Sequence, residues 1–207
     1  MPYCFDNFMA EVAMQLWWQW WSLVAPLRAA CTRERSFLWL VSALAGYCAR
    51  ADLLGVTSIV RTLGLAARCY DRLLDFFHNS AVDVDALTQR WVQRVMQMLP
   101  VYRAAGRPVF LGDGLKVAKA GRKMPAVKLL HQPGESNTKP PYIMGHSVQV
   151  ISALVAAADS YFAVPLAGRI HEGVKFTNRD HRTLPSKCCD LLESPRVWRV
   201  GLRNTGN

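Results

Sequence analysis

The carboxylate best placed for chemistry is Asp113, in the tripeptide Gly112-Asp113-Gly114. A carboxylate among cations can hold Mg²⁺ while the cations bind phosphates, because Mg²⁺ takes oxygen ligands from carboxylates and substrate phosphates. Two such ions can activate a water and stabilise the leaving oxygen of a phosphodiester. The Asp-Gly pair is also a common two-residue hairpin turn, so both interpretations stay open. Cationic residues lie close to Asp113 in the sequence: Arg103, Arg107, Lys116, Lys119, Arg122 and Lys123.

Other catalytic and metal-binding patterns are not met by the sequence. The Gly112-Asp113-Gly114 run lacks the third glycine of a dinucleotide-binding loop, and no Gly-Lys-Ser/Thr motif occurs. The six cysteines form no Cys-x-x-Cys pair, so we expect reduced thiols in a cytoplasmic protein. The spacing of the histidines does not resemble that of a zinc site; the histidines considered are His131, His146, His171 and His181.

The composition predicts a folded protein with a polyanionic partner. Of the 207 residues, 51% are hydrophobic and 19% are charged, which is enough for a packed core and excludes wholesale disorder. The formal net charge of +10 indicates nucleic acid ahead of membrane lipid. Residues 101–145 hold eight Lys or Arg residues and two Asp or Glu residues, so the positive charge is concentrated there.

Two apolar stretches near the N-terminus are too short to span a membrane. Residues 12–27 are uncharged and contain four tryptophans between positions 17 and 21, and residues 36–49 are also apolar. A spanning helix needs ~20 mostly apolar residues. Asp6 and Glu11 stand where a signal peptide carries basic residues. We therefore expect buried or semi-buried helices and no membrane; the alternative is a membrane-interface helix anchored by the tryptophans.

The first hundred residues have apolar positions at helical spacing and predict a helical region, 1–100. Within it, residues 56–77 predict two short helices joined near Gly64, the layout of a helix-turn-helix that would contact DNA. A plain helical bundle is the alternative, because Asp71 and Asp75 dilute the positive charge. The cations of this segment are Arg61, Arg68 and Arg72.

The pattern changes to strands after Pro100. Residues 109–119, 142–157 and 161–170 are rich in β-branched and apolar side chains, with a turn at Ala158-Asp159-Ser160 between the last two. A helix is predicted over 177–192, followed by an irregular tail at 193–207. The fold class expected is therefore α+β, with helices first and strands second.

Four patches, in this order, resemble bacterial insertion-sequence transposases of the DDE superfamily. Residues 109–124 (VFLGDGLKVAKAGRKM) resemble the first catalytic strand and the basic run that follows it. Residues 142–146 (YIMGH) and 164–169 (VPLAGR) resemble the second and third strands, and 178–184 (NRDHRTL) the entry to the next helix. The resemblance covers residues 50–190 approximately.

The resemblance implies a partial RNase H-like catalytic domain over 101–192, a core with a mixed sheet of which the first three strands and one helix are present. In that family two aspartates and a glutamate hold two Mg²⁺ or Mn²⁺ ions, which cut and join DNA at transposon ends. The first aspartate maps onto Asp113. The helical region would bind the transposon ends, and the basic run beside Asp113 would contribute DNA contacts through Lys116, Lys119, Arg122 and Lys123.

The sequence departs from the family pattern after the third strand. The second aspartate belongs on a fourth strand and the glutamate on a later helix, whereas Asp159, Asp180 and Asp190 fall in a turn or a helix. We therefore expect a truncated or frameshifted transposase that is inactive alone and that forms homo-oligomers or associates with an intact transposase. The alternatives are a non-catalytic DNA-binding protein or repressor and a membrane-associated helical protein.

Overall fold

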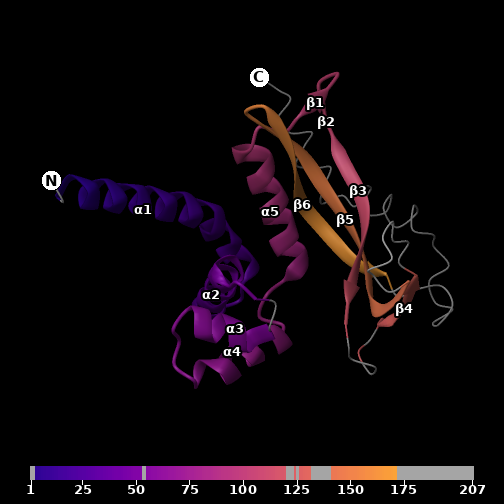
Figure 1. Ribbon diagram of the computed structural model, residues 1–207, viewed down its shortest axis with the longest axis horizontal. Helices are drawn as coiled ribbons and strands as arrows, with labels where there is room; N and C mark the ends of the chain where they lie inside the picture. Colours follow the sequence, from indigo (N-terminus) through magenta and orange to yellow (C-terminus); the bar gives the residue numbers. More distant parts are fainter. Residues whose placement is uncertain (1–2, 53–54, 120–123, 125, 132–140, 172–207) are drawn as a thin grey trace. The chain divides into compact units, whose positions relative to one another are not determined.

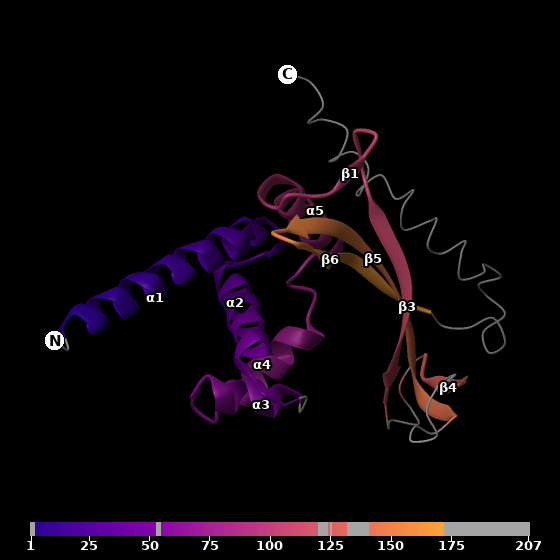
Figure 2. The ribbon, with the colours of Figure 1, turned by 45° about the horizontal axis from the view of Figure 1, so that its top comes forward.

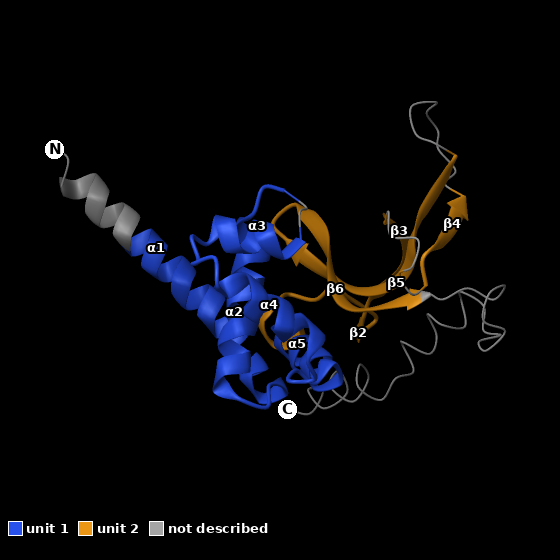
Figure 3. Cartoon of the chain, turned by 90° about the horizontal axis from the view of Figure 1, so that it is seen from below, with its two compact units in different colours: residues 1–94 blue, residues 95–207 orange. Residues whose placement is uncertain are grey.

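The computed structural model describes residues 3–52, 55–119, 124, 126–131 and 141–171, with side chains from residue 11 to residue 170 within these ranges. The chain divides into two compact units, Met1–Arg94 and Val95–Asn207 (Figure 3). The helix predicted over 177–192 and the tail predicted at 193–207 lie outside the described residues. The helical and strand-rich parts confirm the α+β class at this coarse level.

The first unit is helical, as the spacing of its apolar residues predicts. A proline at position 26 lies in the first turn of the 3-10 helix that directly follows the first α-helix, since Pro is favoured in the first turn of a helix. Helix α3 and helix α4 lie against one end of α2, and α1 leads away from the other end (Figure 2). The helices are α1 (Tyr3–Val24), η1 (Ala25–Ala30), α2 (Glu34–Ala49), α3 (Gly55–Thr62), α4 (Cys69–His78) and α5 (Val84–Met98), the last crossing the division between the units.

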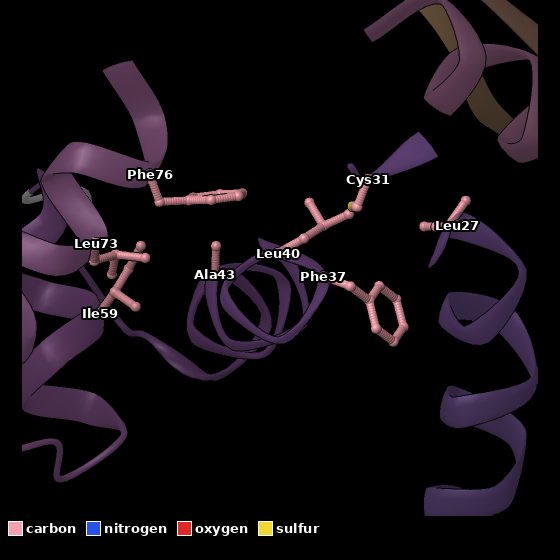
Figure 4. Close-up of a cluster of buried hydrophobic side chains, with 8 residues drawn as sticks. All are labelled: Leu27, Cys31, Phe37, Leu40, Ala43, Ile59, Leu73 and Phe76. Atoms are coloured by element: carbon pink, nitrogen blue, oxygen red, sulfur yellow. The ribbon is translucent and has the colours of Figure 1, made fainter. Parts of the chain in front are cut away.

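The core of the helical unit gathers on both sides of α2. Ile59 and Leu73 are fully buried where α3 and α4 pack on this helix. Gly46 of α2 lies so close to Ile59 that a methyl group there would overlap the isoleucine side chain. The close approach is possible because glycine has no Cβ. Figure 4 shows the cluster: Leu27, Cys31, Phe37, Leu40, Ala43, Ile59, Leu73 and Phe76.

The helix ends follow local sequence signals. Gly64 adopts φ +60° between α3 and α4, a left-handed conformation that glycine adopts at no steric cost. This confirms the two helices predicted over 56–77 with their junction near Gly64. Asp83 caps α5, because its Oδ1 accepts hydrogen bonds from the amides of Asp85 (2.9 Å) and Ala86 (3.0 Å).

The second unit contains an antiparallel sheet centred on β5 (Figure 1). Strand β3 pairs along one edge of β5, and β4 and then β6 pair along the other. A separate hairpin precedes the sheet, with Ala105 and Gly106 both at positive φ in its turn. The strands are β1 (Arg103–Ala104), β2 (Arg107–Pro108), β3 (Phe110–Ala118), β4 (Lys128–His131), β5 (Tyr142–Ala157) and β6 (Ser160–His171).

The three predicted strands are confirmed, and the turn between β5 and β6 falls at Ala158 and Asp159. One face of β5 is buried and its residues alternate along the strand, as the twofold period of a strand requires. The sequence interpretation missed β4 and the hairpin of β1 and β2, whose two- to four-residue strands are too short for a clear alternation. The buried positions of that face are Gln149, Ile151, Ala153 and Val155.

Among the described helices, none is long and apolar enough to cross a membrane. Helix α1 is the longest, at 22 residues, and it begins nine residues before the apolar stretch predicted from the sequence. Its polar residues include Asp6, Glu11, Gln15 and Gln19.

Candidate functional site

Asp113 lies in the middle of β3, opposite Val150 of β5. The Asp-Gly pair is therefore part of a continuous nine-residue strand, and the hairpin turn that it also suggested is wrong. The side chain of Asp113 is exposed, and its Oδ1 accepts a hydrogen bond from the Gly114 amide at 2.7 Å. The ladder with β5 thus holds the backbone of Asp113 while its carboxylate remains accessible.

The amide that binds Asp113 belongs to the outer edge of β3. The Leu154 amide donates to the Val109 carbonyl and the Lys119 amide donates to the Met144 carbonyl, so odd-numbered residues of this strand turn their backbone groups toward β5. Even-numbered residues, including Gly114, then turn theirs to the outer edge. Among the described strands β3 pairs with β5 alone, so this edge is available to a further strand or ligand.

Apolar side chains surround the carboxylate on its face of the sheet. Leu111, Leu115 and Val117 share the odd-numbered face with Asp113, because alternate residues of a strand point to the same side. Their exposed fractions are 41%, 48% and 41%. Asp113 is also the only carboxylate residue in the described strands β1 to β6. The face is therefore a mostly apolar surface with one acid near its middle.

Lys116 does not share that face. It occupies an even-numbered position, and its Nζ donates to the carbonyl oxygen of His131 at 2.6 Å, which ties β3 to β4. Lys119 follows the end of β3 and is exposed. The pleat of the strand therefore places Lys116 on the face opposite to Asp113, away from the carboxylate that it was expected to accompany. Arg122 and Lys123 lie outside the described residues.

Of the metal site that the sequence predicts, the described residues provide one candidate ligand, Asp113. The described residues contain no group of three His, Cys, Asp or Glu side chains that could hold a metal ion. A two-metal site needs several carboxylates, because each ion must be coordinated while it contacts the phosphate. Asp113 by itself does not fit a complete Mg²⁺ or Mn²⁺ site, although its exposed carboxylate can serve as one ligand.

The cations predicted to contact DNA in the helical unit are exposed. Arg61 lies in the last turn of α3, Arg68 stands at the N-cap of α4, and Arg72 follows it one turn later. Residues four apart share one side of a helix, so Arg68 and Arg72 present one surface of α4. Asp71 and Asp75 are also exposed on this helix, so α4 carries both negative and positive charges on its surface.

Two features of the sites were not found from the sequence. His131 makes an edge-on ring contact with Tyr142, with centroids 5.1 Å apart, beside the Lys116 hydrogen bond. Trp17 and Trp18 of α1 are 57% and 65% exposed, where a buried or semi-buried helix was expected. Comparison of the chain with family models, curated proteins and solved structures finds no match.

Proposed function

We propose that this protein binds duplex DNA. The support is its net charge of +10 together with two sets of exposed cations. One set is formed by Arg61, Arg68 and Arg72 of the helix-turn-helix-like pair α3 and α4, and the other includes Lys119 at the end of β3. Phosphate contacts by such side chains supply most of the affinity in sequence-independent DNA binding.

Within that class we propose a transposase of the DDE type that acts on transposon ends. One observation carries this choice: Asp113 lies midway along β3, the first strand of the antiparallel series β3, β5 and β6. An RNase H-like core begins with such a series, and the resemblance at residues 109–124 puts the first catalytic aspartate at this position. Asp113 would then be one ligand of the Mg²⁺ or Mn²⁺ ions that assist phosphodiester cleavage.

DNA binding is tested by fluorescence anisotropy with the full chain and a labelled duplex of arbitrary sequence. The triple variant Arg61→Ala, Arg68→Ala, Arg72→Ala should weaken binding and reduce the slope of log affinity against log salt by about 1 for each phosphate that the variant no longer neutralises. Arg35→Ala, which removes an exposed cation from α2, is the matched control and should change neither. If the triple variant and the wild type have the same affinity and the same salt slope, the surface of α3 and α4 is excluded as a DNA-binding surface.

A non-catalytic DNA-binding protein is the second candidate. It is favoured by the single carboxylate of the described strands and by the lack of a three-ligand group among the described residues. Incubation of supercoiled plasmid with Mg²⁺ or Mn²⁺ separates the two. Nicking by wild type that disappears in Asp113→Asn supports the transposase, whereas binding without nicking supports the second candidate.

A further inference from the structure

The second unit carries two exposed tyrosines whose rings are in contact. Tyr102 directly precedes β1 and Tyr161 is the second residue of β6, and their ring centroids lie 5.4 Å apart at an interplanar angle of 83°. The exposed fractions of Tyr102 and Tyr161 are 39% and 60%. The contact brings the hairpin of β1 and β2 to the end of the sheet where β5 turns into β6 (Figure 1). Two large rings are therefore presented together at this end.

Strand β5 positions both rings on one face of the sheet. Tyr161 pairs with Ala156, and the Tyr102 amide donates to the Leu154 carbonyl oxygen at 2.8 Å. Positions 154 and 156 lie on the same side of β5, because alternate residues of a strand point the same way. Asp113 belongs to this side as well, since it pairs with position 150. The tyrosine pair and Asp113 thus share one face.

An arginine of the hairpin is on the same side as the rings. Arg107 pairs with Ala104, and the Val109 amide donates to the Tyr102 carbonyl oxygen at 3.0 Å, so the ladder of the hairpin continues to Tyr102. Tyr102 and Ala104 are two residues apart and therefore point to one side, together with the residue opposite Ala104. The side chain of Arg107 is exposed there.

The charges at this end of the sheet favour an anionic partner. Arg107 and Arg103 of the hairpin are both exposed, and Asp159 in the turn between β5 and β6 is the acid that opposes them, which leaves a positive balance. Asp113 pairs with Val150, four to six residues along β5 from the positions that carry the rings, which is about 13–20 Å. This exceeds the Debye length of ~10 Å at 0.1 M salt, so the Asp113 carboxylate is screened at the rings.

We propose that Tyr102, Tyr161 and Arg107 bind a single strand of nucleic acid, with unpaired bases stacked on the rings and a phosphate bound to the guanidinium. Aromatic side chains exposed on a sheet are a platform for unpaired bases, and neighbouring cations hold the backbone. In a duplex the bases stack on one another, so the rings have little to bind. That the strand is DNA rests on the proposed function.

The stacking is tested by fluorescence anisotropy of the full chain with a labelled oligothymidine of about ten nucleotides. Tyr102→Ala and Tyr161→Ala should each raise the dissociation constant about fivefold or more, because each removes a ring on which a base stacks. Tyr161→Phe keeps the ring and should retain the wild-type affinity. Phe162→Ala is the matched control: Phe162 is 57% exposed but pairs with Val155 on the opposite face, so the affinity should not change. Circular dichroism checks that all variants are folded.

The phosphate contact is tested by the salt dependence of the same titration. Arg107→Ala should reduce the slope of log affinity against log salt by about 0.7, the value for one phosphate of a single strand. Arg169→Ala is the matched control, because Arg169 is exposed on the same sheet but pairs with Gln149 on the opposite face. Equal effects of Arg107→Ala and Arg169→Ala would overturn the assignment of the phosphate to this face.

Parallel titrations with a blunt duplex separate this inference from the proposed function. The two tyrosine-to-alanine variants should bind the duplex as wild type does, and an equal loss on both ligands would overturn the stacking. Wild-type affinity of these variants for oligothymidine would overturn the inference alone. Tyrosine-dependent binding of oligothymidine by a chain that does not bind the duplex would support the inference and reject the proposed function. Tighter, tyrosine-dependent binding of oligouridine would assign the surface to RNA and overturn the choice of DNA.

Discussion

At the scale of the residue, Ser58 stands out in the helical unit because its hydroxyl is buried. The residue is 2% exposed, and its Oγ finds no hydrogen-bond partner in the part of the chain that the structure describes. A buried polar group without a partner destabilises a protein by about 1–3 kcal/mol. The position lies in α3 directly before the buried Ile59, so the helix sets the direction of the hydroxyl.

Replacing Ser58 by alanine should therefore raise the free energy of unfolding by about 1 kcal/mol. Alanine removes the unpaired hydroxyl and also has the higher helix propensity. Urea denaturation followed by circular dichroism measures the change. Thr57→Ala alters an exposed neighbour in the same helix and should stay within about 0.5 kcal/mol of wild type. A loss of stability in Ser58→Ala would instead mean that the Ser58 hydroxyl makes a stabilising hydrogen bond.

Cys31 makes a pH-dependent contribution to stability. Burial raises the pKa of its thiol above the ordinary value of 9.0; Arg28 opposes this shift and Glu34 adds to it. The folded state therefore favours the protonated thiol more than the unfolded state does. This contribution is complete below pH 9.0 and is lost as the pH rises through the folded pKa.

The difference in unfolding free energy between wild type and Cys31→Ala should accordingly shrink at alkaline pH. Below pH 9.0 the thiol is protonated in both the folded and the unfolded state, so the wild type keeps the full stability that the buried thiol contributes. Above pH 9.0 the thiol ionises more readily in the unfolded chain, which stabilises the unfolded state and lowers the unfolding free energy of the wild type. Denaturation series at several pH values on both sides of 9.0 measure it. A difference that does not change with pH would mean that the thiol has the same pKa in both states.

At the scale of the element, the contact of α2 with α3 depends on a missing side chain. Gly46 packs directly against Ile59, while Gly55, at the start of α3, has no neighbouring atom within 4 Å of the place where a Cβ would stand. The two helical glycines thus have opposite roles. One permits a close helix–helix approach, and the other adds only conformational freedom to the unfolded chain.

Alanine at these two glycines should change stability in opposite directions. Gly46→Ala should lower the unfolding free energy by about 1–3 kcal/mol, because the added methyl forces α2 and α3 apart. Gly55→Ala should raise it by about 0.4–1 kcal/mol, because it restricts the unfolded chain without a clash. Thermal and urea denaturation of the two variants provide the comparison. Stabilisation by both substitutions would show that α2 and α3 can separate at little cost.

At the scale of the whole molecule, the distribution of charge determines which kinds of partner the protein attracts. The net charge of +10 attracts a polyanion, while helix α1 carries only acids among its charged residues. The proposed DNA contact is therefore assigned to surfaces other than α1. The cations proposed to contact phosphates belong to α3, α4, β2 and the end of β3, and α1 contributes none of them.

The affinity for duplex DNA should fall steeply with salt concentration. Counterion release gives a slope of about −0.9 in log affinity against log salt for each phosphate contact, so three or four contacts give a slope of roughly −3 to −4. Titrations at several salt concentrations measure it with the wild-type chain. Met14→Glu, which alters an exposed residue of α1, should leave the slope unchanged, because α1 contributes none of the proposed phosphate contacts. Salt-independent binding would exclude phosphate contacts as the source of affinity.

Several features could be predicted from the sequence because they depend on neighbours in the chain. The helices at positions 56–77, their junction at Gly64 and the hairpin turn after β5 all follow from local hydrogen bonding or backbone preference. Strands β1, β2 and β4 escaped detection because their two to four residues carry too little pattern. The pairing that stabilises them comes from strands distant in the sequence, or from a turn whose residues include an unusual Ala105.

The sequence alone therefore determined the helical and strand-rich parts, the positive charge and the candidate role of Asp113. The tertiary structure decided that Asp113 lies within a strand, because pairing with Val150 overrides the local turn preference of Asp-Gly. It also decided that Lys116 lies on the other face, tied to His131. The tertiary structure likewise decided that Trp17 and Trp18 of α1 are exposed. Whether an apolar side chain is covered depends on distant elements that no local pattern specifies.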